Sequence, residues 1–194
     1  MATISFRMRP RAILIATALG ALLAGTAPGC IAQQAPPQVQ PQPAQYRLSE
    51  QDDRFLEDLS RRSFQFFWEQ ADTATGIVRD RSRTDGSPAS QRAREIGSIA
   101  SVGFGLSGLC IAAERGWLPR AQVVDRARTT LQFFAERMDH QNGWFFHFVN
   151  LRTGAREWQS ELSSIDTALL LGGVLTVRRC FDDDPEVVRS ADAI

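Results

Sequence analysis

Residues 96–113 read IGSIASVGFGLSGLCIAA, a run of 18 residues without a charged side chain. Such a run is either a membrane-spanning helix or a helix buried inside a globular domain. Four Gly and three Ser residues lower its hydrophobicity, which favours a buried helix that packs closely against another helix through its small residues. Glu114, Arg115 and Gly116 follow as a helix-stop pattern.

Helical patterns flank this run on both sides. Before it, Ser49 and Asp52 predict a capping box for a helix that ends before the turn at Thr75 and Gly76. After it, Pro119 predicts the first position of an amphipathic helix. Apolar residues recur there at three- and four-residue steps: Val124, Ala127, Leu131, Phe134 and Met138.

The C-terminal third continues the same pattern. Residues 143–149 (GWFFHFV) predict an irregular or hairpin-like connection. A further helix is expected to start at Ser160 or Ser163 and to run to about Cys180, and the last one starts with Pro185 in its first turn.

Uncharged helices therefore alternate with half-polar ones, which is typical of two concentric layers of helices. No stretch alternates for long enough to predict a sheet, so the fold class is all-α. About five helices are predicted, whereas a closed double ring needs about twelve. We therefore expect an incomplete ring and a chain that corresponds to part of a larger domain.

A dinucleotide-binding loop is rejected although residues 103–108 (GFGLSG) fit G-x-G-x-x-G. That motif needs a buried strand before it and a second strand that carries an acidic residue. Residues 99–102 make a poor strand, and Asp125 falls inside the predicted amphipathic helix. Glycines that let two helix backbones approach closely explain the pattern better.

The N-terminus predicts export. Residues 1–30 have a basic start with Arg7, Arg9 and Arg11, then the uncharged segment 13–25. The segment ends in a loose lipobox at Cys30, and lipidation of Cys30 is favoured over cleavage after Ala32. Residues 31–46 form a Pro/Gln-rich linker, and the folded domain is 47–194. We expect a periplasmic or outer-membrane-anchored lipoprotein, or otherwise a secreted protein.

Charge and cysteine content exclude several partners. The 22 basic and 22 acidic residues balance, which argues against nucleic acid, and membrane contact is expected only through a lipid anchor. Cys110 and Cys180 lie in apolar helical patterns and are interpreted as buried free thiols, with a disulfide between them as the alternative. No Cys/His spacing resembles a zinc site, so no metal is predicted.

Candidate catalytic residues lie in residues 158–171 (WQSELSSIDTALLL), where two carboxylates follow an aromatic ring and precede an apolar helix. Glu161 is the candidate general acid, with a pKa raised by partial burial near Trp158. Asp166 is a candidate for positioning sugar hydroxyls or water. The alternative for Glu161 is a solvated residue at the helix N-terminus that the helix dipole favours. The alternative for Asp166 is helix capping, since Ser163 and Asp166 match a capping box. On one helix the two carboxylates would point about 140° apart, so they converge only if Glu161 lies off the helix.

Candidate sugar-binding residues are more dispersed. Asp80 and Arg81 follow a Gly turn, and their alternative is a surface ion pair. Trp144 and Trp158 are candidates for stacking on pyranose rings, with core or rim packing as the alternative. His147 lies in an aromatic run and is either a ligand-binding or a structural histidine.

Several segments together resemble the bacterial glucoamylase-like family of glycoside hydrolases, which includes endo-β-1,2-glucanases. The resemblance rests on residues 66–69 (FFWE), 75–82 (TGIVRDRS), 98–106 (SIASVGFGL), 113–117 (AERGW) and 161–170 (ELSSIDTALL). It implies an (α/α)6 barrel, of which this chain resembles the N-terminal half, and an exported enzyme that hydrolyses a glucan with inversion.

The combined prediction is an exported glycoside hydrolase that acts on a β-glucan, with β-1,2-glucan favoured and without a metal or organic cofactor. A second catalytic carboxylate is expected outside this chain. The alternatives are a non-catalytic carbohydrate-binding lipoprotein and a helical interaction scaffold.

Overall fold

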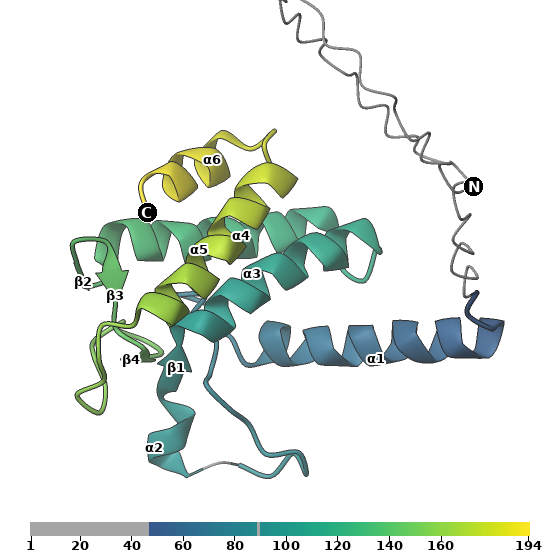
Figure 1. Ribbon diagram of the computed structural model, residues 1–194, viewed down its shortest axis with the longest axis horizontal. Coiled ribbons are helices and arrows are strands. Elements are labelled where there is room, and N and C mark those ends of the chain that lie inside the picture. Colours follow the sequence, from purple (N-terminus) through teal and green to yellow (C-terminus); the bar gives the residue numbers. More distant parts are fainter. Residues whose placement is uncertain (1–46, 89) are drawn as a thin grey trace, which may run out of the picture. The chain divides into compact units, whose positions relative to one another are not determined.

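The computed structural model describes residues 47–88 and 90–194, which form six α-helices and four short strands (Figure 1). The predictions for residues 1–46, including Cys30, lie outside the described residues. The helices dominate, so the all-α prediction is confirmed, and within the described residues they do not close into a ring. The elements in chain order are α1 (Glu50–Glu69), α2 (Gln91–Arg94), β1 (Ile96–Ser98), α3 (Ile99–Glu114), α4 (Arg120–Arg137), β2 (His140–Gln141), β3 (Trp144–Phe145), β4 (Phe148–Asn150), α5 (Ser164–Cys180) and α6 (Pro185–Asp192).

Helices α3 and α5 form the centre of the domain and lie side by side (Figure 1). Both begin beside the strands and run in the same direction. A Cβ atom added to Gly103 would lie 2.2 Å from the carbonyl oxygen of Leu169, and one added to Gly173 would lie 2.2 Å from that of Gly103. Small residues therefore do let two helix backbones touch, as the sequence predicts, and Gly103 is inside a helix and not in a nucleotide-binding loop.

The remaining helices pack around this pair. Helices α1 and α4 contact α3, and α6 contacts α4 and α5. The shared core includes Ile99, Val102, Leu106, Leu131, Phe145, Leu170, Val174 and Phe181, all at most 2% exposed. No described helix is both long enough and apolar enough to cross a bilayer.

The start of the uncharged run differs from the prediction, because Ile96–Ser98 is a strand and not helix. Strand β1 pairs antiparallel with β4 in the register Ile96↔Asn150, Gly97↔Val149 and Ser98↔Phe148. A side chain on Gly97 would meet Ile77 at 2.3 Å, so glycine permits the close approach. The Ser98 hydroxyl accepts the Ser101 N–H (3.4 Å) and starts α3 one residue later.

The hairpin-like connection is confirmed. Strands β2 and β3 pair as His140↔Phe145 and Gln141↔Trp144. The two residues between them, Asn142 (φ 52°) and Gly143 (φ 81°), both adopt positive φ, as a tight hairpin turn of the I′ kind requires. The sequence argument against any sheet therefore missed two short two-stranded ladders, because strands of two or three residues leave no visible alternation.

Helix starts largely follow the sequence. Ser49 and Asp52 form the predicted capping box, and Ser163 caps α5. Pro119 is the cap residue of α4 instead of its first helical residue. Helix α1 differs most from an ordinary amphipathic helix, because its N-terminal apolar side chains are exposed and only Phe64 is buried.

Asp184 joins α4 to α6. It caps α6 by accepting the N–H groups of Glu186 and Val187, both at 3.1 Å. Its carboxylate also accepts two N–H bonds from the Arg128 guanidinium on α4, with Nε at 3.1 Å from Oδ2. This guanidinium contact holds the pKa of Asp184 at about 2, below its ordinary 3.8.

We expect Asp184→Ala to lower the free energy of unfolding by about 3 kcal/mol, since it removes both a helix cap and a charge-assisted pair. The pKa of Asp184 is lower in the folded protein, so its charge stabilises the fold fully above pH 3.8 and stops doing so as pH falls through about 2. Urea unfolding at neutral and acid pH measures the change in the free energy of unfolding. Asp184→Asn keeps a capping group, so its stability should differ from that of the native chain only while Asp184 is ionised.

The control is Asp183→Ala, whose pair with Arg120 is solvent-exposed and contributes less than about 1 kcal/mol. Equal losses for Asp183→Ala and Asp184→Ala would contradict the assignment.

Candidate functional site

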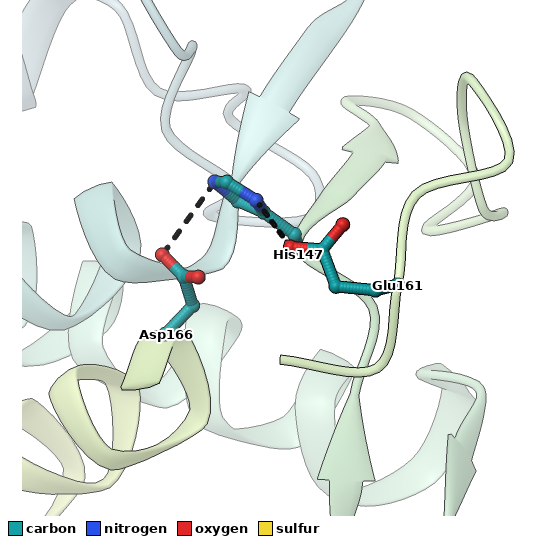
Figure 2. Close-up of side chains that lie close together, drawn as sticks. All are labelled: His147, Glu161 and Asp166. Carbon is teal, nitrogen blue, oxygen red and sulfur yellow. Dashed lines mark hydrogen bonds and ion pairs between the residues drawn. The ribbon is translucent and has the colours of Figure 1, made fainter. Parts of the chain in front are cut away.

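The imidazole of His147 lies between two carboxylates (Figure 2). Its Nδ1 is 3.0 Å from Oε1 of Glu161, and its Nε2 is 3.6 Å from Oδ1 of Asp166. These three residues, here called the His147 cluster, come from the segment before β4, the loop after it and the first turn of α5. The cluster unites three of the residues selected from the sequence.

Glu161 is placed by backbone pairing. The His147 N–H donates to the Glu161 carbonyl (3.1 Å), and a β-bridge joins Phe146 to Leu162. The Ser160 hydroxyl accepts the Phe148 N–H (3.2 Å) and donates to its carbonyl (3.1 Å). Glu161 therefore lies in an extended segment before α5, and this is the geometry in which the two carboxylates can converge.

Asp166 is a helix-capping residue, as one of its alternatives predicts, and it also contacts His147. It lies in the first turn of α5, where its N–H donates to the Ser163 hydroxyl (3.2 Å) and its carboxylate accepts from that same hydroxyl. Its side chain is 11% exposed, and its other oxygen faces His147. The helix cap thus orients the carboxylate towards the imidazole, so capping and a role in the cluster do not exclude each other.

The electrostatics of Glu161 contradict one expectation. Its side chain is 65% exposed, and its pKa is lowered and not raised. The causes are the hydrogen bond from its own backbone N–H, then the His147 side chain, with weaker attraction from His147 and Arg156. The predicted rise through burial is wrong because the carboxylate faces solvent and hydrogen-bond donors, both of which favour the charged form.

The spacing of the cluster also limits its chemistry. One nitrogen of His147 and one oxygen each of Glu161 and Asp166 lie within 4.8 Å of one another. The two carboxylates of an inverting glycosidase are about 6.5–9.5 Å apart, because a water molecule must fit between one of them and the sugar. Glu161 and Asp166 are therefore too close to serve as the two members of such a pair.

One imidazole and two carboxylates are also a donor set that divalent transition metals accept. The sequence did not indicate this group, because its members are 14 and 5 residues apart along the chain and match no metal-binding motif. Within the cluster, Nδ1 of His147 is hydrogen-bonded to Glu161, whereas Nε2 makes a longer contact of 3.6 Å with Asp166.

Aromatic rings continue from the cluster towards solvent. The His147 ring stacks on Phe148 with centroids 3.7 Å apart, and Phe148 meets Trp158 edge-on at 5.1 Å. Trp158 is 43% exposed and has a φ of 54°, an uncommon conformation for a residue with a bulky side chain. The Arg156 guanidinium holds this loop by donating to the carbonyls of Gln159 (2.6 Å) and Ser160 (2.5 Å).

The other candidates make no direct contact with the cluster. Asp80 pairs with its neighbour Arg81, and its N–H donates to the Ile96 carbonyl (3.0 Å). Trp144 is an exposed residue of β3. Within residues 47–88 and 90–194, no hydrogen bond, ion pair or ring contact joins these three residues to the His147 cluster. Their assignment as sugar-binding residues stays a prediction.

A charged depression of about 540 Å³ is separate from the cluster. Its lining includes Glu69, Asp72, Arg79, Arg94 and Glu95, and contains no member of the cluster.

Three residues that position the cluster and Trp158 were not identified from the sequence: Ser160, Phe148 and Arg156. Only the tertiary contacts identify them, because each is an ordinary residue type at an uninformative spacing.

Comparison with known proteins supports the resemblance. The chain is 26% identical over 154 residues to an exo β-1,2-glucooligosaccharide sophorohydrolase of Parabacteroides distasonis, a match that covers 73% of this chain and 20% of that protein. It also superposes on an endo-β-1,2-glucanase of Chitinophaga pinensis, solved with sophorotriose and glucose, with a TM-score of 0.65 and 25% identity, over 76% of this chain and 35% of that one. A β-1,2-glucanase structure from Parabacteroides distasonis matches in fold, with a TM-score of 0.62 and 22% identity, over 76% of this chain and 20% of that one.

No family model matches the chain. The likeness to glucoamylase-like glycoside hydrolases that include β-1,2-glucanases is nevertheless confirmed in both sequence and structure. The chain spans about a fifth of the curated relative and about a third of the endo-β-1,2-glucanase.

Proposed function

We propose that this chain carries part of the active site of an exported glycoside hydrolase that cleaves a β-glucan, with the β-1,2 linkage preferred. The observation that carries the proposal is the His147 cluster beside the exposed ring of Trp158, in a fold shared with an endo-β-1,2-glucanase. Carboxylates for proton transfer next to an aromatic face for a pyranose ring are the groups that glycoside hydrolysis requires. The substrates named for the two relatives support the choice of linkage.

Glu161 is assigned as the residue that transfers a proton during cleavage of the glycosidic bond. It is the more exposed of the two carboxylates, so an incoming sugar reaches it first. Its lowered pKa keeps it ionised at neutral pH, which is the form that accepts a proton. The proton-donor role expected from the sequence requires the bound glucan to raise this pKa by excluding water.

His147 and Asp166 are assigned positioning roles. Asp166 is anchored by Ser163 and faces Nε2, which orients the imidazole so that Nδ1 faces Glu161. Trp158 is assigned to stacking on a sugar ring. Because Glu161 and Asp166 are too close to form an inverting pair, the reaction needs another carboxylate on the far side of the glycosidic bond.

Export is proposed from residues 1–30, with lipidation at Cys30. Metabolic labelling of the expressing cell with a fatty acid tests the anchor, and Cys30→Ser should abolish the label and release the protein.

Because the second carboxylate is expected outside this chain, the activity is tested on a version in which this chain is joined to the rest of the helical domain that its relatives possess. The purified protein is incubated with β-1,2-glucan and, in parallel, with β-1,3-glucan and starch. We expect new reducing ends from β-1,2-glucan only, at a rate that a metal chelator does not change, because the proposed chemistry uses proton transfer alone. Binding without turnover would support a non-catalytic carbohydrate-binding protein instead. If no glucan is bound or cleaved, the proposal is wrong.

A further inference from the structure

Cys110 and Cys180 occupy equivalent positions on the two central helices. Each lies seven residues after one of the glycines at which the helices touch, Gly103 on α3 and Gly173 on α5. Seven residues are close to two helical turns, so each cysteine lies on the same face of its helix as the glycine. Because α3 and α5 run in the same direction (Figure 1), the two cysteines reach the same level of the helix pair.

The contacts of Cys110 bring the two thiols together. Its Sγ atom is 3.9 Å from the carbonyl oxygen of Thr176 on α5. In an α-helix this carbonyl accepts the N–H of residue 180, and side chains tilt towards the helix N-terminus. The Cys180 side chain therefore leans over the turn that Cys110 contacts. Burial raises the pKa of the Cys110 thiol, and the neighbouring Cys180 thiol raises it further.

The two thiols differ in access. Cys180 is exposed, whereas Cys110 is half-buried, so the expected burial of both is wrong for Cys180. An exposed thiol can meet an oxidant directly, and the half-buried thiol beside it is placed to complete the reaction.

We propose that Cys110 and Cys180 form a disulfide bond that links α3 to α5 when the protein meets a disulfide oxidant such as oxidised glutathione. The Cys180 thiolate attacks one sulfur of the oxidant, which forms a mixed disulfide and releases one reduced thiol. The Cys110 sulfur then attacks the Cys180 sulfur, which forms the Cys110–Cys180 bond and releases the second reduced thiol. The two protein thiols are oxidised, the oxidant disulfide is reduced, and the two thiol protons pass to its products.

The bond would link residues that are 70 positions apart, and a cross-link of that span restricts the unfolded chain strongly. It would also lie at the C-terminal end of α5, whereas Asp166 lies in the first turn. We therefore expect a change in stability with the geometry of the His147 cluster unchanged. The proposal does not depend on the assignment of glycosidase activity.

The test uses the full chain with Cys30→Ser, so that only the two helical thiols remain. After reduction, the protein is incubated with oxidised and reduced glutathione, its free thiols are titrated, and its peptides are mapped by mass. We expect loss of both thiols, a peptide pair joined through Cys110 and Cys180, and a rise in Tm of about 10 °C that a reductant reverses. Cys180→Ser, an exposed substitution that leaves the core intact, should abolish the bond and the rise.

Two results would overturn the proposal. One is that both thiols stay titratable while an added model dithiol is oxidised in the same buffer. The other is that glutathione adducts or disulfides between separate chains form in place of the internal bond.

Discussion

Gly173→Ala is expected to lower the free energy of unfolding by about 3 kcal/mol, the upper end of the usual cost of overpacking. The added methyl group would lie 2.2 Å from the Gly103 carbonyl oxygen and 2.6 Å from its Cα atom. Both are backbone atoms of the facing helix, so no side chain can rotate away, and α3 and α5 must separate. Urea unfolding followed by circular dichroism measures the change.

The neighbouring glycine on the same helix is the matched control. A Cβ atom at Gly172 meets no atom within 4 Å, and the residue is exposed. Because alanine favours helix over glycine, Gly172→Ala should raise the free energy of unfolding by about 0.5–1 kcal/mol. If the two substitutions have the same effect, close backbone contact between α3 and α5 is not what holds the domain together.

In a version that completes the helical domain, Glu161→Gln is expected to lower kcat on β-1,2-glucan by about 10²–10⁴-fold, the usual contribution of a group that transfers a proton. The amide keeps the size of the side chain and a hydrogen-bonding oxygen beside His147, but it cannot exchange a proton. Glucan binding, measured by calorimetry, should therefore be retained. The measurement is the initial rate of reducing-end release at saturating glucan.

The control for this prediction is Glu157→Gln. Glu157 belongs to the same loop but hydrogen-bonds Asn150 (3.2 Å), so its substitution should leave kcat nearly unchanged. Unchanged turnover by Glu161→Gln would reject Glu161 as the proton-transfer residue.

The pH profile provides a second check. A base must be ionised to act, so kcat/KM falls as pH drops below its pKa in the free enzyme. The pKa of Glu161 is lowered from 4.5, so this acid limb should lie below pH 4.5. A limb above that value would show that another group controls the reaction.

Local features of the fold were predictable because their signals lie in neighbouring residues. The capping box at Ser49 and the cap at Ser163 each depend on a side chain and a backbone N–H three positions later, so sequence spacing locates them. The Asn142-Gly143 turn was not singled out in the sequence, although it depends only on two neighbouring residues that tolerate positive φ. Strand β1 was missed because its partner, β4, lies about fifty residues away and three residues show no periodicity of their own.

The site was predictable in its members but not in its chemistry. Glu161, Asp166 and His147 all appeared as candidates, yet the pKa of Glu161 was expected to move in the opposite direction. That direction depends on exposure and on the position of the His147 ring, neither of which a residue type reveals. Asp80, Arg81 and Trp144 were candidates on the same grounds of residue type but make no direct contact with the cluster.

By itself, the sequence determined that helices dominate, that α3 and α5 are apolar, and that glycines on α3 allow close packing, because these properties follow from composition and local periodicity. Only the tertiary structure decided that Gly103 faces Gly173, that His147 separates two carboxylates, and that Cys110 lies beside Cys180. The physical reason is that each of these contacts joins segments that are separate in sequence. Their distances are set by how backbones pack and pair across the domain, and no local propensity encodes them.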